Sequence, residues 1–182
     1  MKRLKLMAAV SIFLTGLACA GEALAGEATA SGTTIGVAVA GGENSSQAYD
    51  LYVTQVLEPF LGNETISLNP LLEAGLQAWD RSDKTVWGAN GNLGLGVYLF
   101  PEGDVRPFVM GTFGYAHISG KTFGNRNLGT HSQFRTRGSL GIDFGEDCRH
   151  TFKINFTHYS NGGMAHDNDG YNTIGGSYGF TF

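Results

Sequence analysis

The chain of 182 residues is long enough for one domain, and its composition narrows the class of protein it can be. Only 15% of the residues are charged while 42% are hydrophobic, which argues against an intrinsically disordered chain. The 28 glycines lack the three-residue period of collagen, and a formal net charge of −4 gives no support to nucleic-acid binding, which normally needs a basic surface.

The first 25 residues have the organisation of a secretory signal peptide. Three basic residues precede an apolar run from Leu6 to Leu17, and Ala23-Leu24-Ala25 has the small residues of a cleavage site. The apolar run is shorter than the roughly 20 residues that a membrane-spanning helix requires. We therefore expect a signal peptide at residues 1–25 and a single exported domain at residues 26–182.

The two cysteines lead to different expectations. Leu17-Ala18-Cys19 resembles a lipoprotein processing site, but the Ala-Leu-Ala motif that follows favours cleavage after Ala25 instead. Cys148 then remains alone, which excludes an internal disulfide. We expect Cys148 to be a small buried hydrophobic residue rather than a reactive thiol.

The exported part contains eight segments in which apolar and polar side chains alternate with a period of two, the pattern of β-strands. Turn-like pieces rich in Gly, Asn, Asp and Ser separate them. One segment is long for a strand, and its glycines between Gly88 and Gly96 suggest a bulge. The expected strands are Thr33–Ala40, Ala48–Leu57, Leu71–Arg81, Thr85–Phe100, Val105–Ile118, Ser132–Phe144, Arg149–Ser160 and Asn172–Phe182.

The two faces of these strands differ in a way that suits a membrane barrel. A soluble sandwich buries its apolar faces, whereas a membrane barrel turns them to lipid and packs a polar, glycine-containing interior. Both arrangements satisfy the same alternation. The even number of strands, the low charge and the aromatic last strand ending at Phe182 favour the barrel. We therefore predict an all-β protein, an eight-stranded antiparallel transmembrane β-barrel, over a soluble β-domain.

The same alternation assigns side chains to the inside and outside of the barrel. Charged residues that fall on the polar face should form an interior network that stabilises the barrel. Large aromatic residues are expected to contribute to girdles at the membrane interfaces. The predicted network contains Glu73, Arg135, Arg137, Asp143 and Lys153, and the predicted girdles contain Trp79, Trp87, Tyr98 and Tyr159.

The residues with the clearest chemical potential lie at the end of the seventh expected strand, in His158-Tyr159-Ser160-Asn161-Gly162-Gly163. His158 and Ser160 continue the apolar, outward face of that strand, and residues two apart on a strand are about 6.6 Å apart at Cα. Asn172 falls on the corresponding face at the start of the next strand. A polar cluster among lipid headgroups would account for these positions, but the histidine–serine spacing also suits a general base and a nucleophile. Asn161 or the amides of Gly162 and Gly163 could supply oxyanion donors.

This segment, followed by Asn168-Asp169-Gly170-Tyr171-Asn172 and a final amphipathic strand, resembles the lipid A 3-O-deacylase (PagL) family of outer-membrane lipases. The resemblance is sharp over residues 158–182, with the active-site segment at residues 158–172. It implies hydrolysis of the ester-linked acyl chain at position 3 of lipid A, without a cofactor, in the outer membrane of a Gram-negative bacterium. It also implies that Ser160 is the nucleophile and His158 the general base, and that Asn161 and Asn168, with amides near Gly162 and Gly163, form or shape the oxyanion hole.

Asn172 departs from the pattern that this family shows. The resemblance places Asn172 at the third triad position, where the best-known member has a glutamate. An asparagine can orient a histidine by hydrogen bonding but cannot supply negative charge to an imidazolium. Asp167 or Asp169 in the preceding loop could compensate. If the missing charge limits the reaction, the substitution Asn172→Glu should raise activity.

The sequence keeps two other functions open. One is a non-enzymatic small outer-membrane barrel that is structural or binds a partner, and the other is a barrel acyltransferase that passes the acyl group to another alcohol. No metal is expected, because Asp167–Gly170 lacks the later glutamate of a calcium loop and His158 and His166 lack further zinc ligands. Lipid A, or the lipopolysaccharide that contains it, is the expected partner. A monomer and a homodimer both remain open.

Overall fold

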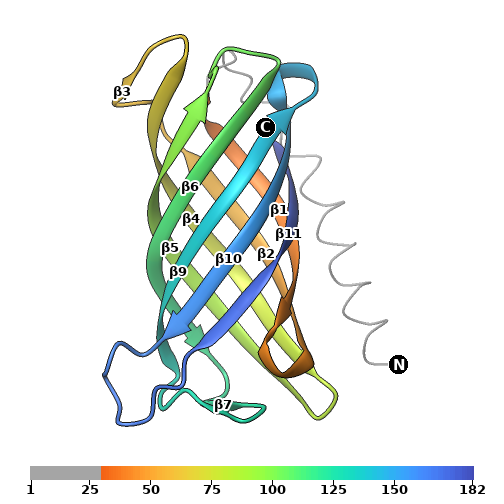
Figure 1. The fold of residues 1–182 in the computed structure, drawn as a ribbon, viewed down its shortest axis with the longest axis vertical. Coiled ribbons are helices and arrows are strands. Elements are labelled where there is room, and N and C mark those ends of the chain that lie inside the picture. The colour runs from red at the N-terminus through yellow and green to blue at the C-terminus, as the bar shows by residue number, and fades with distance from the viewer. Residues whose placement is uncertain (1–29) are drawn as a thin grey trace.

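The computed structural model describes residues 30–182, and the alternating segments form eight long antiparallel strands there (Figure 1). The expected signal peptide therefore lies outside the described residues. The long strands are β1 (Gly32–Gly42), β2 (Ser46–Val56), β4 (Ile66–Arg81), β5 (Lys84–Leu99), β6 (Val105–Ile118), β9 (Ser132–Phe144), β10 (His150–Ser160) and β11 (Tyr171–Thr181). The short elements are η1 (Glu43–Ser45), β3 (Leu61–Gly62), β7 (Thr122–Phe123), β8 (Arg126–Asn127) and η2 (Glu146–Cys148).

The sheet closes on itself and confirms the predicted barrel. Long strands that are consecutive along the chain pair with each other, including β2 with β4, and the pairing of β1 with β11 joins the first strand to the last and completes the ring. Every long strand therefore has two antiparallel partners, so closure removes the exposed edges that a glycine-rich sheet would otherwise present. None of the helical segments in residues 30–182 is long and apolar enough to span a membrane.

Two details of the strand prediction are wrong. The pairing of β5 with β4 and with β6 runs without offset through residues 88–96, so the predicted bulge is absent from this described strand. β4 begins at Ile66 rather than Leu71, because Pro70 lies inside the strand instead of ending it. The Pro70 carbonyl accepts a hydrogen bond of 2.9 Å from the backbone of Leu57, which keeps the chain extended at that point.

The wall of the barrel has an apolar outer face and a mainly polar inner face. This is the inverse of a soluble domain and is the arrangement expected in lipid. The exposed apolar side chains on the strands include Val39, Val53, Leu72, Leu76, Leu93, Leu95, Val109, Phe113, Leu140, Ile142, Phe152, Ile154, Phe156, Ile174 and Tyr178. The buried polar side chains include Asn69, Glu73, Gln77, Asn92, Arg135, Arg137, Asp143, Lys153, Asn155, Thr173 and Ser177.

The predicted charged residues lie inside the barrel and are centred on Glu73, except that Asp143 forms a separate ion pair of 3.7 Å with Arg106 Nη2. Glu73 Oε1 lies 2.8 Å from Arg135 Nη1 and 3.4 Å from Arg137 Nη1. Asp50, which the sequence analysis did not single out, forms an ion pair with Arg137 and balances the second guanidinium. Lys153 lies over the ring of Tyr52, with its Nζ 4.3 Å from the ring centroid. The cations of the network are thus met by carboxylates or an aromatic face, as buried charge requires.

Apolar clusters fill the barrel at each end of this network, and they correct the girdle prediction. One cluster contains Trp79 and Tyr159, and the other contains Tyr98. All three side chains are almost fully buried inside the barrel, whereas Trp87 is 52% exposed on the outer face. Aromatic residues were assigned to the interface by type, but strand parity places three of these four on the inner face.

The two ends of the barrel differ in their connections. One end, here called the terminal end, carries the C-terminus, β3 and the turns at residues 100–104 and 145–149 (Figure 1, top). The opposite end, here called the loop end, carries η1, the β7–β8 hairpin and residues 161–170.

At the terminal end Cys148 is free and 3% exposed, and burial raises the pKa of its thiol, in agreement with the unreactive role expected for it.

The interior network predicts a stability difference between buried and exposed charges. The substitution Glu73→Ala leaves two buried guanidinium groups with one carboxylate, so we expect a loss of about 3–5 kcal/mol in the free energy of unfolding. The control Asp83→Ala removes the exposed ion pair with Arg81 and should cost at most about 1 kcal/mol. Urea unfolding in phospholipid bilayers measures both, and equal losses would contradict this account of the network.

Candidate active site

The pairing of β10 with β11 brings the predicted site residues to one place at the loop end. His158 lies directly opposite Asn172 in this ladder, and Ser160 is the last residue of β10. The adjacent residues Tyr159 and Tyr171 are buried inside the barrel. Because side chains alternate along a strand, His158, Ser160 and Asn172 all lie on the outer wall.

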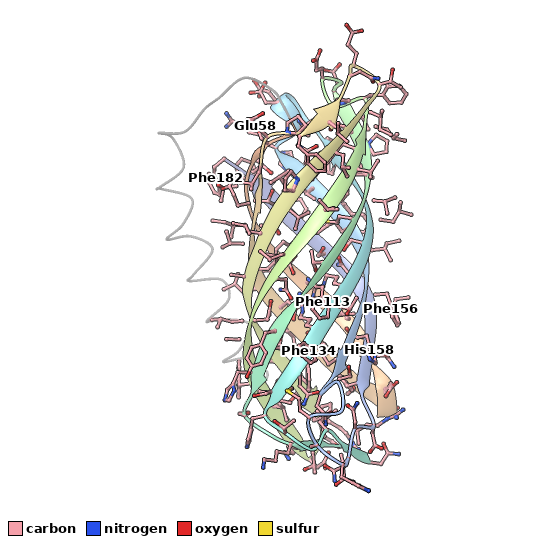
Figure 2. The ribbon with its side chains drawn as sticks, turned by 90° about the vertical axis from the view of Figure 1, so that its left-hand side faces the viewer. Glu58, Phe113, Phe134, Phe156, His158 and Phe182 are labelled. Carbon is pink, nitrogen blue, oxygen red and sulfur yellow. The ribbon has the colours of Figure 1, made fainter. Side chains whose placement is uncertain are left out.

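Apolar side chains surround this part of the outer wall. Figure 2 shows His158 with Phe113, Phe134 and Phe156 around it on the same side of the barrel. Phe134 pairs with Ser160 across β9 and β10, and its ring stacks on Phe113 at 5.7 Å between centroids. Phe113 and Phe156 are each more than half exposed. The serine and the histidine therefore lie beside an apolar, lipid-facing surface rather than in a water-filled cavity.

His158 is held by Asn172, and Asn172 is held in turn by a residue that the sequence analysis did not identify. His158 Nδ1 lies 2.7 Å from Asn172 Oδ1, and Asn172 Nδ2 donates a 2.7 Å hydrogen bond to Glu43 Oε1. Glu43 lies in η1 and is separated from Asn172 by 129 residues of the chain. No local pattern links the two residues, because they meet only when β1 pairs with β11.

The aspartates that could have compensated for Asn172 make other contacts. Asp167 Oδ2 accepts a 2.7 Å hydrogen bond from the side chain of Asn127, and Asp169 Oδ2 accepts one of 2.6 Å from the Asn127 backbone. Both carboxylates thus fasten residues 161–170 to the β7–β8 hairpin. The carboxylate connected to His158 through Asn172 is that of Glu43.

Ser160 lies on the same face of β10 as His158, one residue pair further along. Within residues 30–182, no hydrogen bond joins the side chains of Ser160 and His158. Such catalytic hydrogen bonds are often long in unliganded enzymes and shorten when substrate binds. Gly170, at φ +66°, lies against the imidazole, and a Cβ there would come within 3.2 Å of His158 Cε1. The glycine thus gives the ring room beside the strand.

Asn161 organises the loop that follows Ser160. Its side chain is fully buried, and its Nδ2 donates to the backbone carbonyls of Leu128 (3.0 Å) and Asp167 (2.6 Å). Its Oδ1 accepts from the Gly163 backbone, while its own backbone N–H donates to Asn168 Oδ1, each at 2.8 Å. These contacts occupy the polar atoms of the Asn161 side chain, so they indicate a loop-shaping role for it.

Among the donors of the loop after Ser160, two at predicted oxyanion-hole positions make no hydrogen bond within the described part of the chain. These are the backbone N–H of Gly162 and the side-chain amide nitrogen of Asn168. Gly162 has φ +61° and packs against the Phe134 ring, where a Cβ would come within 2.6 Å of the ring, so this position requires glycine. Among residues 30–182, His, Cys, Asp and Glu side chains form no group of three or more that could hold a metal ion.

Comparison with known proteins gives one family match. The family model described as lipid A 3-O-deacylase (PagL) matches residues 46–181. The lipid A deacylase PagL of Pseudomonas aeruginosa is 29% identical over 99 residues, which cover 54% of this chain and 56% of that protein. The matched segment thus spans about half the length of this relative.

Solved structures show the same fold. The crystal structure of the outer membrane enzyme PagL superposes with a TM-score of 0.74 at 23% identity, covering 82% of this chain and 99% of that one. The Neisserial surface protein A superposes with a TM-score of 0.58 at 8% identity, covering 85% and 98% of the two chains. At these identities the superpositions establish the small barrel architecture alone.

The contacts of Asn161 predict a local effect of its removal. The substitution Asn161→Ala deletes three side-chain hydrogen bonds, so amides in residues 161–170 should exchange hydrogen about 10-fold faster or more, with the strands unchanged. Hydrogen–deuterium exchange with mass spectrometry measures this. The control Asn63→Ala removes a side chain that accepts two backbone hydrogen bonds at the terminal end and should leave residues 161–170 unaffected. Unchanged exchange in Asn161→Ala would refute the loop-shaping role.

Proposed function

Because the chain belongs to the lipid A 3-O-deacylase family, we propose that it is an outer-membrane hydrolase that removes the ester-linked acyl chain at position 3 of lipid A. The observation that carries this proposal is the position of His158, Ser160 and Asn172 on the outer wall, at the end of an apolar stripe. A soluble ester would not concentrate at a lipid-facing surface. A lipid of the same membrane leaflet reaches it by lateral diffusion.

In the first half of the reaction, Ser160 Oγ attacks the carbonyl carbon of the ester while His158 Nε2 takes the hydroxyl proton. Asn172 holds the opposite ring nitrogen of His158. The Gly162 N–H and the Asn168 side-chain amide, which make no hydrogen bond within the described residues, stabilise the oxyanion of the tetrahedral intermediate. The intermediate collapses when the protonated His158 gives its proton to the departing sugar hydroxyl, which leaves the acyl group on Ser160.

In the second half, water replaces the sugar hydroxyl. His158 takes a proton from water as its oxygen attacks the acyl-serine, and the same proton returns to Ser160 Oγ when the fatty acid leaves. The reaction consumes one water and needs no redox partner. The apolar wall around Phe113 and Phe156 provides a surface on which the fatty acyl chain lies during both steps.

The proposed nucleophile predicts a change in lipid A composition. Cells that express the intact protein should contain lipid A that has lost one 3-linked acyl chain, and Ser160→Ala should lower the rate by a factor of about 10⁴ or more. Mass spectrometry of extracted lipid A measures this loss. Heat-modifiable migration on gels confirms that each variant forms a folded barrel. As a matched control, Ser31→Ala at the terminal end should leave deacylation unchanged.

One result would oppose the proposed mechanism, and two would oppose the function. Continued deacylation by a folded Ser160→Ala variant would show that the serine is not the nucleophile. Unchanged lipid A with a folded intact barrel would favour a structural or partner-binding role. Recovery of the acyl chain on another alcohol, instead of as free fatty acid, would indicate an acyltransferase.

A further inference from the structure

Glu43 lies at the end of a chain of polar contacts that begins at His158. The imidazole contacts Asn172, Asn172 donates to Glu43 Oε1, and Glu43 Oε2 lies 2.7 Å from Arg126 Nη2. This last contact is an ion pair without the alignment of a hydrogen bond. Neither Glu43 nor Arg126 lies on the strands that carry His158 and Ser160, since they belong to η1 and β8. At the loop end of the barrel, the Glu43 carboxylate is thus connected to His158 through Asn172, which occupies the expected third position of the triad.

The carboxylate decides which way the Asn172 amide faces. An ionised carboxylate only accepts hydrogen bonds, so Asn172 must direct its Nδ2 towards Glu43 and its Oδ1 towards His158. An amide oxygen accepts a hydrogen bond, so the proton of the neutral imidazole belongs on Nδ1. Nε2 is then left with the lone pair that takes the proton of Ser160. An asparagine without Glu43 could turn its NH₂ group towards the ring and favour the opposite, inactive tautomer.

Several contacts hold Glu43 in this position. The β1–β11 register pairs Gly42 with Thr173, which places the next residue of the turn beside Asn172. The Ser46 hydroxyl bonds the Glu43 carbonyl, and the Tyr171 hydroxyl lies 2.7 Å from Ser46 Oγ. Gly42 packs so closely on Tyr171 that a Cβ there would overlap the tyrosine hydroxyl. The turn is therefore fastened to the first residue of β11, the strand that carries Asn172.

Arg126 links this turn to the loop that follows Ser160. Its Nη1 donates a 3.1 Å hydrogen bond to the Asp169 carbonyl, while its Nη2 lies against Glu43. The guanidinium lies against Oε2, which leaves Oε1 for the hydrogen bond from Asn172. From these contacts we propose that Glu43 is a positioning residue for the deacylation reaction: through Asn172 it sets the tautomer and orientation of His158 and supplies the negative charge that Asn172 lacks. This inference rests on the proposed function.

The first test is the substitution Glu43→Gln, which keeps the shape of the side chain but removes its charge. A glutamine amide can also donate hydrogen bonds, whereas an ionised carboxylate only accepts them. Loss of a carboxylate that contacts the histidine directly costs about 10⁴-fold in kcat, so a carboxylate that acts through an amide should be worth less, about 10- to 100-fold. KM should change little, because Glu43 lies behind Asn172. The control Glu64→Gln, at an exposed turn of the terminal end, should leave both constants unchanged. A change confined to KM, or an unchanged kcat, would overturn the proposal.

A second test moves the charge instead of removing it. Asn172→Glu alone should lower activity, because two carboxylates would then face each other and disfavour each other's ionisation. The double variant Glu43→Gln with Asn172→Glu places a single carboxylate directly against His158 and should restore kcat to within about 10-fold of the unsubstituted protein. A merely structural role of Glu43 predicts no such rescue. If Asn172→Glu alone raises activity and Glu43→Gln adds nothing, Glu43 is not the charge that His158 uses.

A third measurement does not depend on catalysis and separates failure of this proposal from failure of the proposed function. In the barrel labelled with ¹⁵N-histidine, the neutral His158 ring should carry its proton on Nδ1, and the signal is assigned by its absence in His158→Gln. Glu43→Gln should shift the ring towards the other tautomer, and Glu64→Gln should not. An unchanged tautomer would overturn the positioning role even if lipid A is deacylated. A shifted tautomer in a barrel that leaves lipid A intact would refute the activity and keep the positioning.

Discussion

The structure depends on the pairing of β1 with β11, which closes the sheet. Without it, two edges of unpaired backbone groups would face the membrane, where water cannot satisfy them. The same pairing brings the first turn of the barrel beside the start of the last strand. Glu43 therefore reaches Asn172 as a direct result of the closure that makes the fold stable in lipid. The register of the β1–β11 ladder therefore determines both the closure of the barrel and the contact of Glu43 with Asn172 behind His158.

Closure also determines what the interior must contain. A barrel of eight strands is just wide enough for side chains to fill, so the inner faces need mutually compatible groups. Here Glu73 and Asp50 meet two arginines at mid-height, and apolar clusters around Trp79 and Tyr98 close the space above and below. This packed interior leaves the outer wall as the surface on which a lipid-directed site can lie. The site residues occupy that wall, with the buried tyrosines Tyr159 and Tyr171 behind them.

The site combines a rigid part and a fastened loop. His158, Ser160 and Asn172 project from paired strands, so their spacing follows from strand geometry. The proposed oxyanion donors belong to residues 161–170, which have no regular structure and are held by Asn161, by the contacts of Asn127 and by Arg126. Polar contacts from the β7–β8 hairpin and from within the loop therefore hold residues 161–170 beside His158 and Ser160. This division suits an enzyme whose substrate approaches from the membrane, because the loop can shape the oxyanion hole without altering the lipid-facing wall.

The sequence by itself determined the strands, their number and the outward face of His158, Ser160 and Asn172, because a period of two is a local property that each strand carries alone. It also indicated the interior positions of Glu73, Arg135, Arg137, Asp143 and Lys153. It did not predict that Trp79, Tyr98 and Tyr159 pack inside, nor that β4 continues through Pro70, since these follow from the space between strands that only closure defines. The contact of Glu43 with Asn172 was decided by the tertiary structure alone. The two residues lie near opposite ends of the described chain, and only the register of the closing ladder brings them within hydrogen-bonding distance.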